Sequence, residues 1–177
     1  MFQIFTRLRR RGSAAALAVL MVLPGAALAA EGALPTLRGQ VILTVSGAIG
    51  TANSDSEAAF DRDMLAALPQ HEIRTTTEWT DGVKVFRGPL VSDLLAAVGA
   101  SGDSVVATAL NDYSVEIPLR DFADYPAILA MSMDGVPLTV RTKGPLWIVY
   151  PRDDYKELQK PEMNSRWIWQ LRSLEIR

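Results

Sequence analysis

The 177-residue sequence contains no cysteine and only one histidine, His71. The absence of cysteine excludes disulfide bonds, thiolate metal ligands and a cysteine nucleophile. A histidine-based triad would need His71, yet no G-x-S-x-G motif supplies a serine. We therefore interpret His71 as a surface residue. The acidic residues show no spacing that pairs two carboxylates, so glycosidase or carboxylate-metal chemistry has no positive support.

The N-terminus has the three parts of a secretory signal. Four arginines between positions 7 and 11 precede an apolar run over 14–28, which ends in small residues. We expect cleavage after Ala29 or Ala30, which makes residues 1–30 a signal peptide and the location periplasmic. A membrane anchor would need about 20 uninterrupted apolar residues, and Pro24-Gly25 interrupts this run. The consecutive arginines leave both general secretion and twin-arginine export open.

Removal of the leader leaves 14 basic and 20 acidic residues, a net charge of −6. That sign argues against nucleic acid as a partner. The remaining chain of about 147 residues is close to the usual size of one domain. We expect residues 31–40 to form a mobile linker and residues 41–177 to form the domain, with no transmembrane segment after processing.

Hydrophobic patterning predicts many short strands and two or three short helices, an α+β domain with mainly antiparallel or mixed sheet. Asp61 is the expected N-cap of the first helix, and Pro89 is expected in the first turn of the second. The predicted helices cover 62–68 and 89–99, and the predicted strands cover 41–46, 58–61, 71–79, 83–88, 104–110, 113–119, 127–133, 136–140, 145–150 and 166–176.

Four segments occur in an order that resembles the molybdopterin-binding domain of sulfite-oxidase-like oxidoreductases. They are TEWTDGVKVFRGPLVSDLLAAVGA, ALNDYSVEIPL, ILAMSMDGVPLTVRTKGPLWIVYP and SRWIWQLRSLEI. The resemblance covers about residues 41–176 and implies a single domain of the sulfite-oxidase-like molybdopterin-binding fold. It also implies a molybdenum-pterin cofactor and oxygen-atom transfer as the chemistry of the family.

Two family positions differ in this chain. The cysteine that ligates molybdenum in the family corresponds to Thr75, whose hard hydroxyl is a poor substitute for a thiolate. The arginine of the family's P-L-R motif is Trp147, whereas the basic residue before the closing tryptophan remains as Arg166. We therefore expect a non-catalytic or degenerate member with a sensory or accessory role and no protein metal site. The alternative is a molybdopterin-dependent oxidoreductase with a non-cysteine ligand.

The candidate ligand pocket combines arginines, a lysine and aromatic residues, which suit a small anionic or heteroaromatic ligand. Its expected members are Thr75, Trp79, Tyr113, Lys143, Arg152 and Arg166. The glycine after Lys143 would let the backbone approach a ligand closely. The competing interpretations are a solvated basic face paired with Asp153 and its neighbours, and tryptophans that belong to the core. A membrane sensor or a redox subunit is the expected protein partner.

Trp167 and Trp169 are predicted to share one side of the last strand, with Ile168 on the other. On that pattern we assign both tryptophans to the core.

Overall fold

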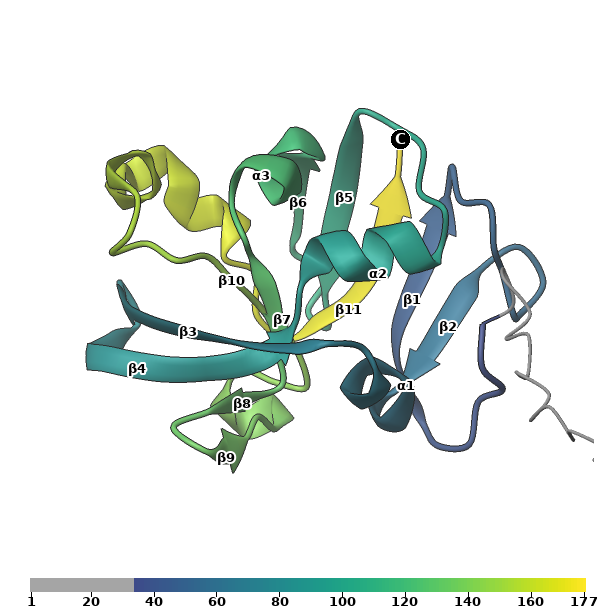
Figure 1. Cartoon of the computed structure of the whole chain (residues 1–177), viewed down its shortest axis with the longest axis horizontal. Coiled ribbons are helices and arrows are strands. Elements are labelled where there is room, and N and C mark those ends of the chain that lie inside the picture. The colour runs from purple at the N-terminus through teal and green to yellow at the C-terminus, as the bar shows by residue number, and fades with distance from the viewer. Residues whose placement is uncertain (1–33) are drawn as a thin grey trace, which may run out of the picture.

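The computed structural model describes residues 34–177, and the predicted signal peptide lies outside this range. Three α-helices and eleven strands form in the described part of the chain (Figure 1). The helices are α1 (Arg62–Ala67), α2 (Val91–Ala97) and α3 (Arg120–Asp124), and the strands are β1 (Val41–Gly47), β2 (Ala58–Asp61), β3 (Gln70–Thr77), β4 (Thr80–Pro89), β5 (Ser104–Ala109), β6 (Ser114–Pro118), β7 (Ile128–Ala130), β8 (Ser132–Met133), β9 (Val136–Pro137), β10 (Trp147–Val149) and β11 (Leu171–Ile176).

The largest sheet has the strand order β2-β1-β11-β5-β6. Its centre joins the two ends of the domain, because β1 pairs in parallel with β11 while the other pairs are antiparallel. Alternating residues of β5 are fully buried, as expected for a strand with one face on the core. Helix α2 lies across this sheet (Figure 1), and Val91 and Leu94 from its buried side join the core cluster.

A second sheet has the order β3-β4-β8-β9 and begins with the predicted hairpin, which turns at Glu78 and Trp79 and not at 80–82 as expected. A third pair, β7 with β10, lies between the two larger sheets in Figure 1. Gly88 makes the approach of β4 to β7 feasible, because a Cβ there would lie 1.8 Å from the Leu129 carbonyl oxygen. The expected α+β architecture with mixed sheets and three short helices is confirmed.

Local signals account for most of the element boundaries. Asp61 caps α1 as expected, since its carboxylate accepts the N–H of Met64 at 2.9 Å. Residues 34–40 form neither helix nor strand, but Leu34 and Leu37 pack against the core. Three short 3₁₀ helices were not expected from the sequence: η1 (Val140–Thr142), η2 (Lys156–Gln159) and η3 (Pro161–Arg166).

Several predicted segments differ from the structure. The predicted strand 136–140 ends at Pro137, and Val140 begins η1. Pro89 ends β4 instead of opening α2, and the predicted strand 127–133 breaks at Met131, after which the chain pairs with a different sheet. The predicted strand 166–176 begins only at Leu171, because Gln170 has a positive φ of 51° that turns the chain.

No helix in the range 34–177 is long and apolar enough to cross a membrane.

Candidate functional site

An open pocket of about 360 Å³ forms where four segments of the chain meet. They are the β3–β4 turn, the end of β5 with its turn into β6, helix η3, and the residues that lead into β11. The lining residues are Trp79, Ala109, Asn111, Tyr113, Asn164, Ser165, Trp167, Ile168 and Trp169.

Packed indole rings form one wall of this pocket. The Trp79 ring centroid lies 5.2 Å from that of Trp169 and 6.0 Å from that of Trp167. Behind them Trp147 is fully buried, and its indole N–H donates to the Trp167 carbonyl oxygen at 3.2 Å. Edge-to-face and tilted contacts of this kind fix the orientation of aromatic rings. The wall is therefore held rigidly before any ligand arrives.

The polar groups of the pocket are neutral. Asn111 and Asn164 supply amides, and Ser165 supplies a hydroxyl that donates to the Glu162 carbonyl oxygen at 3.3 Å. Trp167 is 1% exposed, and its indole N–H has no hydrogen-bond partner within the described range. A buried donor without an acceptor is unfavourable by about 1 to 3 kcal/mol. Because this nitrogen is enclosed by protein atoms, a ligand in the pocket does not reach it.

Of the six predicted site residues, Trp79 and Tyr113 line the pocket. Lys143 lies one layer away, with Nζ 4.7 Å from the Trp169 ring centroid and 5.6 Å from that of Trp147. The other three predicted residues, Thr75, Arg152 and Arg166, are not among its lining residues. Sequence reasoning did not identify Asn164 and Ser165, and nothing in the PEMNSR segment signals a binding role.

The expectation that Gly144 gives a ligand access to the backbone is wrong. A Cβ at Gly144 would lie 2.5 Å from the carbonyl carbon of Leu138 and 2.7 Å from the Thr139 nitrogen. The glycine is needed because two parts of the same chain cross there. The peptide between Gly144 and Pro145 is cis.

Arg166 points to the protein interior and not to the pocket. It forms an ion pair with Asp121 of α3, whose side chain is 6% exposed. Tyr150 belongs to the same region, since the Asp121 carboxylate contributes to its pKa. Burial, followed by that negative charge, raises the pKa of the Tyr150 hydroxyl well above its ordinary value of 10.0. Arg166 therefore joins η3 to α3.

Thr75 and Arg152 belong to a polar junction between β3 and the turn after β10. The fully buried Thr75 hydroxyl accepts the N–H of Asp153 at 3.1 Å, and the Asp153 carboxylate accepts both the N–H and the hydroxyl of Thr76 at 2.7 and 2.6 Å. Arg152 pairs with Glu78 and donates to the Thr76 hydroxyl at 3.3 Å. The predicted pairing of basic residues with acids thus occurs, although with acidic partners other than those expected.

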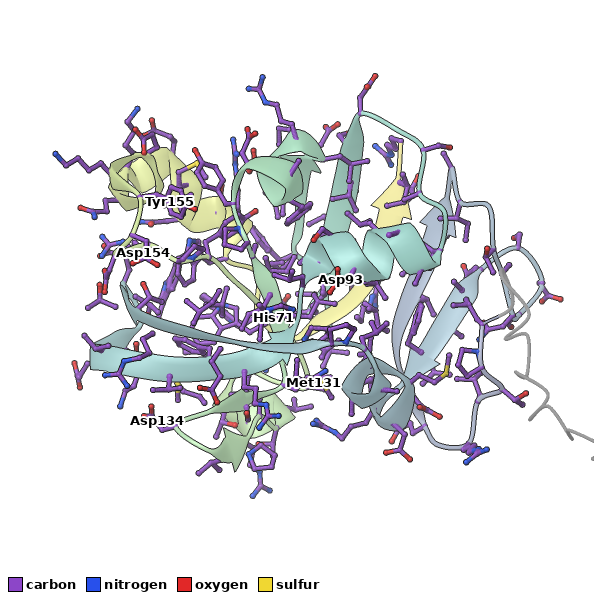
Figure 2. The ribbon with its side chains drawn as sticks, viewed as in Figure 1. His71, Asp93, Met131, Asp134, Asp154 and Tyr155 are labelled. Carbon is purple, nitrogen blue, oxygen red and sulfur yellow. The ribbon has the colours of Figure 1, made fainter. Side chains whose placement is uncertain are left out.

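A second cleft of about 560 Å³ lies beside the edge strand β3. His71 lines it together with Arg74 and Asp154, and Figure 2 shows His71 close to Asp93 of α2. The Nε2 atom of His71 is 3.8 Å from the Asp93 carboxylate, and the His71 side chain is 45% exposed. The cleft lining contains no serine, threonine or cysteine. This environment agrees with the interpretation of His71 as a surface residue.

Comparisons with known proteins identify the family. The model of the oxidoreductase molybdopterin binding domain matches residues 43–153. The chain belongs to this family. That result confirms the resemblance drawn from the sequence, and the missing cysteine distinguishes this member. The match contains Trp79, Asn111 and Tyr113 and ends before η3, which supplies the opposite side of the pocket.

A solved structure supports the fold. The sulfane dehydrogenase SoxCD from Paracoccus pantotrophus is similar with a TM-score of 0.57 and 18% sequence identity, over 76% of this chain and 37% of that one. At this identity the likeness shows the fold alone. This chain spans little more than a third of the length of that protein. Comparison with curated proteins gives no match.

The residues present do not fit the family's metal. The resemblance places the ligating cysteine near Thr75, whose hydroxyl is fully buried and already bonded to the Asp153 N–H. Within residues 34–177 no group of three or more histidine, aspartate or glutamate side chains is placed to hold a metal ion. A neutral hydroxyl is also a hard ligand in place of a soft thiolate. We therefore assign molybdenum no role in the chemistry of this protein.

Proposed function

We propose that this protein is a non-catalytic, periplasmic member of the molybdopterin-binding family, which binds a small heteroaromatic ligand, neutral or anionic, in the pocket beside Trp79. The observation that carries the proposal is the wall of packed indole rings in this pocket, beside the amides of Asn111 and Asn164. Ligand pockets typically combine apolar or aromatic walls with a few convergent polar groups. The volume of about 360 Å³ suits one or two fused rings.

The chemistry of the lining favours a flat ring. The side chains offer three indoles and a phenol for stacking, and amides and a hydroxyl for hydrogen bonds to ring substituents. No charged side chain lines the pocket. Affinity would therefore come from stacking and hydrogen bonds, with charge as a secondary contribution.

A test of this proposal uses the intrinsic fluorescence of the pocket tryptophans. Nicotinamide, a flat neutral ring with an amide, is titrated into the wild type and into Asn164→Ala, with Gln40→Ala as the matched control because Gln40 is exposed and outside the pocket. Loss of one hydrogen bond of about 1 kcal/mol weakens binding about fivefold. We expect that loss in Asn164→Ala and no change in the control. Equal affinity for nicotinamide in all three proteins would show that the pocket is not the binding site.

The predicted export and the absence of a suitable protein ligand for molybdenum favour a sensory or accessory role. The protein would report ligand occupancy to a membrane sensor or serve a membrane redox subunit. The flanking genes discriminate between these roles, since an adjacent sensor kinase or cyclase favours signalling and an adjacent haem-binding membrane subunit favours redox. Neighbours of neither kind would argue against both.

A further inference from the structure

Lys143 is fixed directly behind the pocket wall. It follows η1 with a positive φ of 72°, and its carbonyl oxygen accepts the N–H of Gln170 at 3.0 Å. That bond joins it to the residue after Trp169, on whose ring its ammonium group lies at 4.7 Å. Trp147 provides a second ring at 5.6 Å. The ammonium group is thus placed by the backbone and by two indoles.

A wall of indoles without a resident cation would attract positively charged ligands, because the faces of aromatic rings are electron-rich. Here Lys143 already lies on one ring of the wall, that of Trp169, and on the buried ring of Trp147 behind it. The charged residues beside the lining residues in sequence are each paired with an opposite charge: Asp112 with Arg172, Glu78 with Arg152, and Arg166 with Asp121. Lys143 takes part in none of the ion pairs among residues 34–177. Its charge is therefore uncompensated at the pocket wall.

We propose that Lys143 sets the charge preference of the pocket, so that anionic and neutral ring ligands are accepted and cationic rings are rejected. This inference rests on the proposed function. Lys143 acts as a specificity-determining residue behind Trp169, and it need not contact the ligand. A unit charge within several ångströms of a partly exposed site changes the free energy of binding a charged ligand by about 1 kcal/mol or more.

A matched series of probes tests the charge preference. Nicotinate, nicotinamide and N1-methylnicotinamide share one ring and carry a negative, zero and positive charge. In the wild type we expect affinity to fall in that order. In Lys143→Met, which keeps the length of the side chain, nicotinate should bind about tenfold more weakly and the cation about tenfold more tightly, with nicotinamide changed less than twofold.

Two variants serve as controls. Lys143→Arg keeps the charge on the indoles and should behave as the wild type. Lys156→Met changes the net charge equally at an exposed residue outside the pocket lining and should also leave the order unchanged. An unchanged order of affinities in Lys143→Met, or the same change in Lys156→Met, overturns the assignment.

Collisional quenching of tryptophan fluorescence measures the effect of the Lys143 charge at the pocket wall without any ligand. Iodide, caesium and acrylamide carry different charges, and they quench accessible tryptophans such as Trp79 and Trp169. Lys143→Met should lower iodide quenching and raise caesium quenching relative to the wild type, whereas acrylamide quenching stays constant. If none of the ring probes binds the wild type, the proposed function fails. The ratio of iodide to caesium quenching still tests whether Lys143 sets the charge at the pocket wall. An equal ratio in the wild type and Lys143→Met rejects that role.

Discussion

The carboxylate of Asp61 joins the segment before β1 to the first helix. It accepts the N–H groups of Arg38 and Gly39 at 2.8 Å each, in addition to the capping bond from Met64. These backbone donors, led by Arg38, hold the pKa of Asp61 below its ordinary value of 3.8. Since only the ionised carboxylate accepts all three bonds in full strength, the charge of Asp61 contributes to stability.

The pH dependence of unfolding checks this contribution. Because the pKa of Asp61 is lowered on folding, its contribution is present above about pH 4 and is lost as the pH falls through the folded pKa. We expect Asp61→Asn to be less stable than the wild type at pH 7 and to have a flatter profile of unfolding free energy between pH 5 and pH 2. Urea unfolding of both proteins at each pH measures the difference. Parallel profiles would show that Asp61 is not a source of acid sensitivity.

Single residues also show how far the site could be predicted. The sequence was sufficient to name Trp79 and Tyr113 as pocket candidates, and both line the pocket. It could not show that Asp153 forms hydrogen bonds with the Thr75 hydroxyl and with the N–H and hydroxyl of Thr76. Those bonds join positions 77 or 78 residues apart. Polar contacts of this kind depend on how the sheets meet and leave no local pattern.

At the scale of elements, the ion pair between Arg166 and Asp121 attaches η3 to α3. The Asp121 side chain is 6% exposed and that of Arg166 is 26% exposed. Removal of one partner would leave a largely buried carboxylate without its countercharge. Since η3 also supplies Asn164 and Ser165, this ion pair supports one side of the pocket.

A double-mutant cycle measures the strength of this attachment. We expect Arg166→Met to lower the free energy of unfolding by about 2 to 3 kcal/mol, less than for a fully buried pair because the guanidinium is partly exposed to solvent. The double variant with Asp121→Asn should recover about half of that loss, because the unpaired charge is gone. Additive effects of the two substitutions would show that the pair contributes no coupling.

Elements with local signals were the ones predicted correctly. The β3–β4 hairpin follows β-branched residues, the β5–β6 hairpin follows apolar strands around Asn111-Asp112, and helix α1 follows its cap. The segment 166–170 was wrongly assigned to a strand because its apolar residues also suit an extended chain. Its conformation depends on tertiary contacts, such as the bond from the Ile148 N–H to the Ile168 carbonyl oxygen at 3.0 Å.

At the scale of the whole molecule, the parallel pairing of β1 with β11 holds the beginning and the end of the domain together. Strand order could not be derived from sequence patterns, because periodicity indicates which residues are buried but not which strands pair. The family resemblance predicted the fold as a whole, which the similar solved structure supports, but not the order of the strands. The fold brings the β3–β4 turn, the β5–β6 turn and η3 to one place, and there the tryptophan pocket forms.

We propose that this family member binds a small organic ligand in the tryptophan pocket without a molybdenum centre. The most direct measurement is native mass spectrometry combined with molybdenum analysis of the protein purified from its native cells. We predict a chain that carries one small organic molecule, released on denaturation, with far less than one molybdenum per chain. One molybdenum per chain with a pterin of equal stoichiometry would contradict the account.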